Sequence, residues 1–364
     1  MKIFILTGEK SGDIHAANLV KELRFKKKDL DIKAWGGKRL ISEGVDVVKH
    51  IDSISYMGFW EVFTNLFNIY NNFKQCKKDL LRFNPDLIIL VDYAGFNLRI
   101  AEFAFKNNFK VYYYISPKVW AWKPSRINLI KKYVSKMFVV LPFEKKYFSD
   151  RDFPVEYFGN PLLDEIKLFD SSKIIQSDKK IISLFPGSRE QEIKKVLPIM
   201  LTLVSSFPEY KFIIAATNSF SNDFYKSFVN NEKVEIVFDS SYMIFNSSFL
   251  TVVTSGTASL EAALFNVPQI VCYKTSFVSY VIAKAFIRIK FISLVNILLN
   301  KKVVAELIQN QFTIDTLNIE FNKLIAKKNR ISILAEYKNI YNILSVNNQS
   351  PSKDIANNIL KVKD

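Results

Sequence analysis

Two strand–turn–helix openings, one in each half of the chain, constrain the fold most strongly. In the first half, the apolar residues 3–6 precede a glycine-containing turn at residues 8–13, which opens a helix. In the second half, the apolar residues 181–185 precede the turn 186–189, and a helix is expected to begin near Glu190. A glycine turn lets the backbone approach a ligand, and a helix start offers free N–H groups and a positive dipole end to an anion. We therefore predict two nucleotide-fold domains that face each other across a cleft.

The length of 364 residues, with 49% apolar residues, suits two domains rather than one core. The polar residues 168–180 are the natural linker. We predict a first domain over residues 1–167 and a second over residues 168–350. The last residues, 351–364, are expected to form an amphipathic helix with Ser352 as its N-cap, and this helix is expected to return to the first domain.

Both halves alternate strands with helices, which predicts an α/β fold with parallel sheets. Strands are expected at residues 3–6, 32–36, 86–91, 110–115, 136–141 and 155–158, and then at 181–185, 211–215, 234–238, 250–253 and 269–273. In the first half, helices are expected near residues 59–83 and 98–107.

The formal charge of +16 suits a protein that binds an anionic partner, and nucleic acid, an anionic membrane and phosphorylated substrates are all candidates. The bias of the chain toward Lys, Asn, Ile and Phe offers a further explanation, namely that part of the charge reflects nucleotide composition and carries no function. The two cysteines lack metal-ligand spacing and no signal peptide is apparent, which favours a reduced, cytoplasmic compartment. The longest apolar stretch, residues 277–299, contains Lys284, Arg288 and Lys290, so it is predicted to form amphipathic helices and not to span a membrane.

Two segments of the second half have the chemistry of a diphosphate site. Arg189 directly follows a Gly-Ser turn, where its planar charged group suits a phosphate held by backbone amides. Ser255, Gly256 and Thr257 follow an apolar strand and suit a diphosphate cradle, and Glu261 lies one turn further on, where it can accept hydrogen bonds from ribose hydroxyls. The structural alternatives are an exposed arginine at a helix start and an ordinary capped helix.

Asp92 ends the apolar run 87–91 in the first half. Ligands of open α/β sheets bind beyond the carboxyl ends of the strands, and burial there raises the pKa of a carboxyl group, which suits a general base. Asn97 and Arg99 follow closely and can position hydroxyl groups or phosphate. The alternative is an aspartate that only caps a turn.

Aromatic side chains gather at residues 59–70 and 112–122, where they suit sugars, acyl chains or a membrane surface as well as an ordinary core. Several catalytic signatures are missing from the sequence, namely the Walker A motif, zinc-ligand spacing, the nucleophile elbow and the Gly-x-Gly-x-x-Gly fingerprint. The Asp-x-Asp pairs at 29–31 and 150–152 stand in polar turns. We therefore expect neither a metal nor a cofactor.

Together these motifs resemble the lipid-A-disaccharide synthase family, which are inverting glycosyltransferases of the two-domain GT-B fold. The matching motifs run through most of the chain: residues 8–13, Met57-Gly58 with Glu61-Val62, Asp92 with Phe96-Asn97, Ser116-Pro117 with residues 119–122, residues 141–144, residues 186–189, residues 255–257 with Leu260-Glu261, and Tyr273, Asn296, Glu306 and Gln309. Two departures are Asn160, where the family commonly has histidine, and Ala94-Gly95, where many members have Pro-Asp. The second departure removes a rival carboxylate and leaves Asp92 as the better candidate base.

The resemblance implies transfer of a sugar from UDP-2,3-diacylglucosamine to 2,3-diacylglucosamine 1-phosphate (lipid X), in lipid A biosynthesis, with release of UDP. Asp92 would take the proton of the acceptor hydroxyl, and Arg189 would stabilise the leaving diphosphate without a metal. The donor site implied is Gly187, Ser188, Arg189, Ser255, Gly256, Thr257, Glu261, Tyr273 and Asn296. The acceptor side implied is Glu9, Ser11, Gly12, Asp13, Met57, Glu61, Asn97, Ser116, Trp120 and Trp122.

Substrates with acyl chains imply a peripheral enzyme on the inner face of the cytoplasmic membrane of a Gram-negative-type bacterium, held there by its basic charge. The sequence leaves an oligomer open. The nearest rival function is a UDP-N-acetylglucosamine 2-epimerase or another UDP-sugar enzyme of the same architecture. A basic nucleic-acid-binding protein is more remote, because no recognisable module and no clustered lysines with interleaved aromatics are present.

Overall fold

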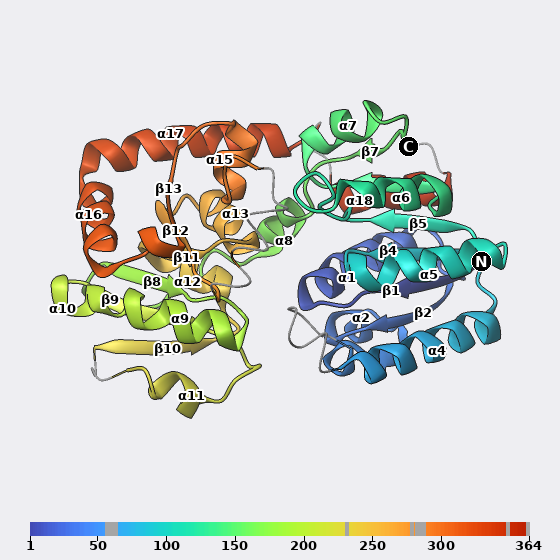
Figure 1. Ribbon diagram of the computed structural model, residues 1–364, viewed down its shortest axis with the longest axis horizontal. Coiled ribbons are helices and arrows are strands. Elements are labelled where there is room, and N and C mark those ends of the chain that lie inside the picture. The colour runs from blue at the N-terminus through green and yellow to red at the C-terminus, as the bar shows by residue number, and fades with distance from the viewer. Residues whose placement is uncertain (55–64, 230–232, 277–279, 281–288, 347–349, 362–364) are drawn as a thin grey trace. The chain divides into compact units, whose positions relative to one another are not determined.

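The structure, a computed structural model, describes residues 1–54, 65–229, 233–276, 280, 289–346 and 350–361. Contacts divide the chain into two compact units. Unit 1 comprises Met1–Asp164 together with Leu344–Asp364, and unit 2 comprises Glu165–Ile343. Each unit contains one parallel β-sheet with helices on both of its faces (Figure 1), so the predicted fold class is confirmed.

Unit 1 contains a seven-stranded sheet in the order β3-β2-β1-β4-β5-β6-β7, and every neighbouring pair is parallel. All five side chains of β4 are buried and apolar, as expected for a parallel strand with helices on both faces. The strands are β1 (Lys2–Leu6), β2 (Asp31–Gly36), β3 (Asp46–His50), β4 (Leu87–Val91), β5 (Val111–Tyr114), β6 (Lys136–Val139) and β7 (Glu156–Tyr157).

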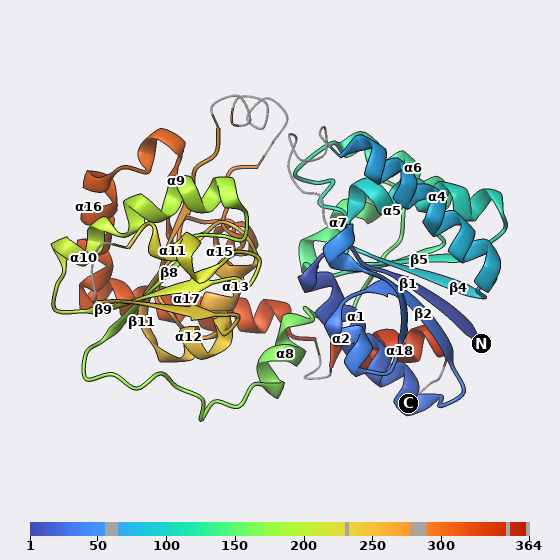
Figure 2. The ribbon, with the colours of Figure 1, turned by 90° about the horizontal axis from the view of Figure 1, so that it is seen from below.

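The helices of unit 1 form two layers, one on each face of the sheet (Figure 2). One core contains side chains of α4, α5 and α6, and the other contains side chains of α1 and α18. The helices are α1 (Lys10–Lys26), α2 (Lys38–Ser42), η1 (Ile51–Ser53), α4 (Leu66–Phe83), α5 (Ala94–Lys106), η2 (Pro124–Arg126), α6 (Ile127–Tyr133), α7 (Pro142–Ser149), α8 (Leu162–Leu168, which runs into unit 2) and α18 (Pro351–Leu360).

The C-terminal helix α18 packs against α1, which confirms that the chain returns to its first sheet. The predicted N-cap was wrong by two residues. The hydroxyl of Ser350 accepts a hydrogen bond from the Lys353 N–H at 3.3 Å, whereas the N–H of Ser352 donates to the Asp164 carboxylate at 3.0 Å. Pro351 occupies the first helical position, where its fixed φ is favourable, so the residue before it becomes the cap.

Unit 2 contains a six-stranded parallel sheet in the order β10-β9-β8-β11-β12-β13. Its strands are β8 (Ile181–Phe185), β9 (Lys211–Ala216), β10 (Val234–Phe238), β11 (Ser248–Thr254), β12 (Gln269–Tyr273) and β13 (Ala305–Ile308). Its helices are α9 (Glu190–Met200), α10 (Thr202–Ser206), α11 (Asn222–Lys226), α12 (Ser241–Ser247), α13 (Thr257–Leu264), α15 (Leu294–Leu299), η3 (Gln309–Gln311), α16 (Ile314–Ile325) and α17 (Lys327–Leu344).

The predicted strands are all present, with ends that differ by a few residues, but β3 and β13 were not expected. Both are edge strands with few fully buried side chains, so their hydrophobic pattern is weak. Helix α5 begins at Ala94 and not at Leu98, directly after the turn that ends β4. Of the helix expected at 59–83, the part from Leu66 to Phe83 is present, and residues 59–64 lie outside the described residues.

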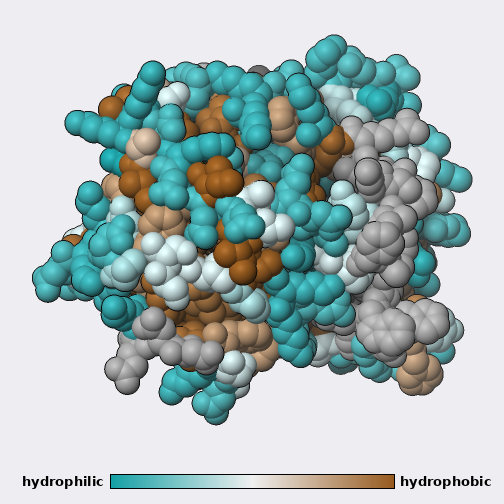
Figure 3. Space-filling view, turned by 60° about the vertical axis from the view of Figure 1, so that its left-hand side comes forward, coloured by the Kyte–Doolittle hydropathy of each residue, from teal (hydrophilic) through white to brown (hydrophobic). Residues whose placement is uncertain are grey.

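Hydrophilic side chains cover most of the face seen in Figure 3, and hydrophobic ones occur between them in small groups. Within the described ranges, no helix is both long and apolar enough to cross a bilayer. Of the predicted amphipathic helices of residues 277–299, residues 277–279 and 281–288 lie outside these ranges, and α15 forms the last part.

Candidate functional site

The strand order of unit 1 places the switch point of its sheet between β1 and β4. The chain continues from β1 to β2 on one side of this pair, and from β4 to β5 on the other. Ligands of open α/β sheets bind at such a switch point, beyond the carboxyl ends of the strands. The segments that leave these ends are Thr7–Glu9 after β1 and Asp92-Tyr93 after β4. The two predicted motifs of the first half therefore lie side by side.

The backbone holds Asp92 in an unusual conformation. Asp92 and Tyr93 have φ values of 46° and 49°, in the left-handed region that non-glycine residues rarely occupy. The carbonyl oxygen of Asp92 accepts hydrogen bonds from the Asn97 amide at 2.7 Å and from the Tyr113 hydroxyl at 2.5 Å. Conformations of this kind persist where surrounding contacts hold them, and they cluster at functional sites.

The carboxyl group of Asp92 has the electrostatics of a general base. Burial raises its pKa above the ordinary value, and the Lys118 ammonium and the N–H of Tyr93 partly oppose that shift. A carboxyl group with a raised pKa is a stronger base than an exposed one. The environment of Asp92 therefore suits the predicted role of general base, which stays a proposal.

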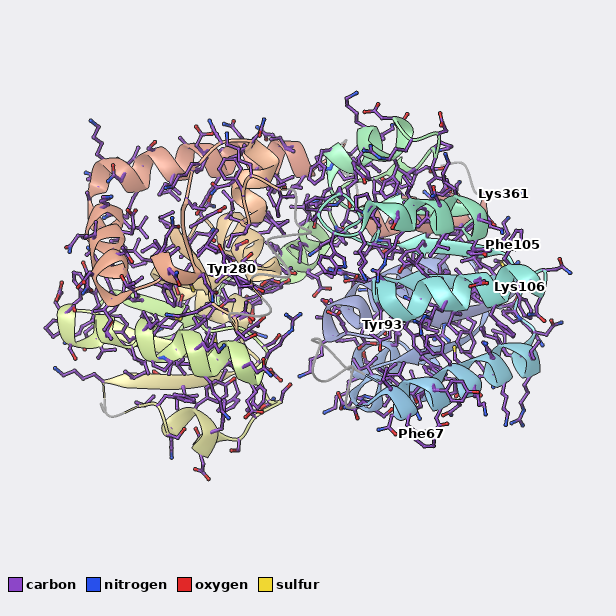
Figure 4. All side chains as sticks on the ribbon, viewed as in Figure 1. Phe67, Tyr93, Phe105, Lys106, Tyr280 and Lys361 are labelled. Atoms are coloured by element: carbon purple, nitrogen blue, oxygen red, sulfur yellow. The ribbon has the colours of Figure 1, made fainter. Side chains whose placement is uncertain are left out.

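Gly8 is required by the close approach of Tyr93. A Cβ atom at position 8 would lie 2.2 Å from Cγ of the Tyr93 ring, so only glycine fits. The Tyr93 hydroxyl donates to the carbonyl of Ile54 at 2.7 Å, and its ring stacks on Phe96 with centroids 5.5 Å apart. Figure 4 labels Tyr93 at this edge of the unit 1 sheet. The glycine of the first turn thus serves the packing of this edge.

Two predicted acceptor-side residues are used internally. The Asp13 carboxylate accepts hydrogen bonds from the backbone N–H groups of Gly37, at 2.6 Å, and Arg39, at 3.0 Å, and so holds the start of α2. The Asn97 amide donates to the carbonyls of Val91 and Asp92. Both side chains thus help to position the backbone here, and their predicted acceptor role stays a proposal.

The remaining residues of the first turn lie at the start of α1. Glu9 is the N-cap residue and is half-buried, and so is Ser11 in the first turn. Gly12 is buried, and a Cβ atom there would lie 3.6 Å from the Val91 side chain. Two further predicted acceptor residues, Met57 and Glu61, lie outside the described residues.

The predicted residues Ser116 and Trp120 are joined by a carboxylate that sequence reasoning did not select as a site residue. Oε1 of the buried Glu144 accepts from the Ser116 hydroxyl at 2.5 Å and from the Trp120 indole N–H at 3.0 Å. Its Oε2 accepts from the backbone N–H groups of Val140 and Leu141. Burial raises the pKa of Glu144, and these donors oppose the shift. Its only sequence signal was its place in the motif at residues 141–144.

Glu144 therefore anchors the loop that presents Trp120 and Trp122. Trp122 is half-buried, and the Lys123 ammonium lies 5.4 Å from the centre of its ring. Rigid amphipathic rings on an anchored loop suit a sugar or an acyl chain. The acceptor role of this loop stays a proposal.

In unit 2 the corresponding switch point lies between β8 and β11. Gly187, in the turn after β8, has a φ of 101°, which favours glycine. Ser188 follows, and Arg189 is the N-cap residue of α9. The Arg189 guanidinium forms an ion pair with Glu192, with Nη1 and Oε1 2.9 Å apart. The turn thus has the glycine, helix start and cation that a diphosphate site needs.

The turn after β11 is held from two directions. The N–H of Ser255 donates to the Cys272 carbonyl at 2.9 Å, and its hydroxyl donates to the Ile292 carbonyl at 2.8 Å. Gly256 is the N-cap of α13, and Thr257, the first helical residue, is exposed. Backbone N–H groups at this helix start are suited to an anion.

Asn296 is fully buried, and its amide is engaged within the unit. Its Oδ1 accepts from the N–H groups of Val303 and Val304, and its Nδ2 donates to the Val304 carbonyl and to the Glu306 carboxylate. Glu306 also accepts from the N–H groups of Ile292 and Ser293. Asn296 thus supports the loop behind Ser255, and its predicted part in donor binding stays a proposal.

Tyr273, at the end of β12, lies close to the Arg189 pair. Burial raises the pKa of its phenol, the Glu192 carboxylate raises it further, and Arg189 opposes the shift. The residues that follow Tyr273 are braced by Gln309, whose amide exchanges two hydrogen bonds with the backbone of Thr275. Unit 2 thus brings Gly187, Arg189 and Tyr273 together at the carboxyl ends of β8 and β12.

The pKa of Glu261, on α13, predicts how the stability of the protein depends on pH. Burial raises the pKa of Glu261 to about 7, and the nearby Glu165 carboxylate adds to the shift. A folded-state pKa above the ordinary 4.5 means that Glu261 stabilises the fold below about pH 4.5, and that this contribution is lost as the pH rises through 7. Glu261→Gln is therefore expected to raise the melting temperature at about pH 8 by several degrees, and to change it little at about pH 5.

Thermal unfolding of both forms at the two pH values checks this expectation. Glu320→Gln is the control, because Glu320 forms an exposed ion pair with Lys323. A Glu261→Gln shift that is equal at both pH values contradicts the predicted titration.

Comparison with protein families and with named proteins finds relatives that match most of the chain. A family model described as lipid-A-disaccharide synthetase matches residues 3–359. The chain is 38% identical over 321 residues to lipid-A-disaccharide synthase 1 of Legionella pneumophila (strain Lens), covering 85% of this chain and 84% of that protein. It is 34% identical over 349 residues to the lipid-A-disaccharide synthase of Coxiella burnetii (strain RSA 331 / Henzerling II), covering 92% of each.

Solved structures with a similar fold are more distant in sequence. The UDP-GlcNAc 2-epimerase from Neisseria meningitidis bound to UDP-GlcNAc has a TM-score of 0.65 at 17% identity, covering 99% of this chain and 100% of that one. An S. aureus MnaA–UDP co-structure has a TM-score of 0.68 at 14% identity, covering 98% and 95%. At these identities the likeness establishes the fold alone.

Proposed function

Because the chain belongs to the lipid-A-disaccharide synthase family of glycosyltransferases, we propose that it joins UDP-2,3-diacylglucosamine to 2,3-diacylglucosamine 1-phosphate and releases UDP. The observation that carries this proposal is the family match over residues 3–359. The product is the β-1,6-linked disaccharide 1-phosphate of lipid A biosynthesis.

In the proposed mechanism, the Asp92 carboxylate removes the proton of the acceptor 6-hydroxyl as that oxygen attacks the anomeric carbon of the donor. The bond between the anomeric carbon and the diphosphate breaks, and the configuration is inverted. The partial burial of Asp92 and the raised pKa of its carboxyl group support this role.

Arg189 and the turns at Gly187 and Gly256 are proposed to bind the donor diphosphate. Negative charge develops on the leaving group as the bond breaks, so a guanidinium and backbone N–H groups at helix starts stabilise the transition state more than the ground state. The electrostatic interaction between Arg189 and Tyr273 supports a common role for the two side chains at the carboxyl ends of these strands.

A two-substrate assay tests the proposed activity. UDP-diacylglucosamine and lipid X are mixed with the enzyme, with and without EDTA, and disaccharide and UDP are quantified. Formation of both products at the same rate in EDTA is expected. An epimerase would instead convert UDP-N-acetylglucosamine without an acceptor, and that result would overturn the proposal.

We also propose that the protein works as a peripheral enzyme on the inner face of the cytoplasmic membrane. Both proposed substrates carry acyl chains, and transferring each CH₂ group out of a bilayer costs about 0.8 kcal/mol. A net charge of +16 would attract the protein to anionic lipid, at about 1 kcal/mol per lysine or arginine near the surface.

Helix α4 supplies the apolar side chains for such contact. Its inner face contributes Phe73, Cys76 and Leu80 to the core. On its outer face Leu66 is 55%, Phe67 75% and Tyr70 56% exposed. Figure 4 shows Phe67 projecting away from the sheet. The Lys74 ammonium lies 4.8 Å from the centre of the Tyr70 ring, so charge and apolar surface are adjacent.

Replacing Leu66, Phe67 and Tyr70 with serine is expected to weaken binding to anionic vesicles about tenfold or more, because each buried apolar side chain contributes about 1.5 kcal/mol or more. Vesicle flotation at low salt measures this, and release of the wild type near molar salt is expected because salt screens the charge. Phe25→Ser is the control, because Phe25 is 83% exposed but lies on α1. Equal binding of wild type to neutral and anionic vesicles would contradict the electrostatic part.

A further inference from the structure

The carboxylate of Glu192 lies beside the glycine turn and pairs with Arg189, the two features that the proposed function assigns to the donor diphosphate. Glu192 is the third residue of α9, and its side chain is 14% exposed. A Cβ atom at Gly187 would lie 2.8 Å from Oε2 of Glu192, so the carboxylate lies against the backbone of the glycine turn. Its Oε1 lies 2.9 Å from Nη1 of Arg189. One carboxylate thus lies beside the turn and pairs with the cation.

This position has a clear physical cause. The start of a helix favours a negative charge, and an acidic residue at the third helical position can reach back toward the residues that precede the helix. A carboxylate and a phosphate oxygen make the same kind of charge-assisted contacts with a guanidinium. The contact that Glu192 makes with Arg189 is therefore one that a diphosphate would also make.

We propose that Glu192 is a built-in competitor of the donor diphosphate: it holds Arg189 and the glycine turn in place when the site is empty and must release Arg189 when the diphosphate enters. This inference rests on the proposed function, because it takes Arg189 to be a diphosphate ligand. Two anions cannot share the turn without strong repulsion, so part of the affinity for the diphosphate is spent on displacing the carboxylate. The same competition favours departure of the UDP product, because Glu192 regains Arg189 as UDP leaves.

The opposite role is the natural alternative. If Glu192 only orients Arg189 toward the ligand, removing its charge loosens Arg189 and weakens UDP binding. Competition predicts the reverse sign. The direction of the change in UDP affinity therefore separates the two roles.

Calorimetric titration with UDP tests the proposal. Glu192→Gln keeps the shape of the side chain and is expected to bind UDP about three- to fivefold more tightly than wild type at about pH 8, a modest gain because the Arg189 ion pair is partly exposed. Glu190→Gln is the matched control. It removes the same charge from the same helix turn, but Glu190 pairs with Lys194 at 2.5 Å and not with Arg189.

The pH dependence gives a second readout. The groups that face Glu192 are Arg189 at the start of α9, and Cys272 and Tyr273 on β12. The Glu192 carboxylate helps to raise the pKa values of Cys272 and Tyr273. Burial raises the pKa of Glu192 itself. A protonated carboxyl group no longer competes, so the difference between wild type and Glu192→Gln is expected to shrink at about pH 5. Comparing the two proteins at each pH cancels the titration of UDP.

Two outcomes overturn the proposal: UDP binding by Glu192→Gln that is weaker than or equal to wild type, or an equal gain in Glu190→Gln. Neither affects the proposed function if Arg189→Ala still loses UDP affinity. If Arg189→Ala binds UDP normally, the donor site itself is misplaced. In the Arg189→Ala background, Glu192→Gln is expected to give no gain in UDP affinity, because there is no guanidinium for which the carboxylate and the diphosphate compete.

Discussion

Asp92→Asn is expected to lower turnover by about 10²- to 10⁴-fold while UDP affinity stays within about twofold of wild type, because the amide cannot accept a proton but keeps the shape of the carboxyl group. The backbone of Asp92 is held by Asn97 and Tyr113 through its carbonyl oxygen, so the substitution leaves those contacts in place. Steady-state kinetics with both substrates and calorimetric titration with UDP measure the two quantities.

Asp150→Asn is a suitable control, since Asp150 pairs with Lys146 in an exposed i,i+4 ion pair. It is expected to have wild-type kinetics. Near-normal turnover of Asp92→Asn would exclude Asp92 as the base and would direct attention to Glu9, Asp13 or Glu61. Because Asp13 is engaged by two backbone N–H groups, its replacement is expected to lower the melting temperature as well.

Arg189→Ala is expected to weaken UDP binding by roughly 10- to 100-fold, since hydrogen bonds to charged groups contribute about 1.5 to 3 kcal/mol. Turnover is expected to fall further than affinity, because the diphosphate gains charge as the glycosidic bond breaks. The measurements are calorimetry with UDP and the rate at saturating substrate.

Lys194→Ala is the matched control, because Lys194 is a cation on the same helix that pairs with Glu190 and not with the glycine turn. It is expected to lose little UDP affinity. Unchanged UDP affinity and rate in Arg189→Ala would show that Arg189 is a surface residue and that the donor site lies elsewhere.

Local sequence patterns were sufficient for the architecture. The apolar runs that precede Gly8 and Gly187 have the length and composition of buried parallel strands, and the glycine turns that follow mark helix starts. Those signals depend on residues close together in the chain, so they can be recognised in the sequence without the tertiary structure. Edge strand β13 was not predicted, because few of its side chains are fully buried and its hydrophobic pattern is therefore weak.

The partners of the buried polar groups were decided only by the tertiary structure. Asp13, Asn296 and Glu144 each have the chemistry of a site residue, yet each satisfies backbone or side-chain donors from another segment. A buried polar group must find such partners, but the sequence does not say which distant segment supplies them. Glu144 is the sharpest case: its carboxylate accepts from Ser116 and Trp120, which lie 28 and 24 residues earlier in the chain, and only the fold brings those segments together.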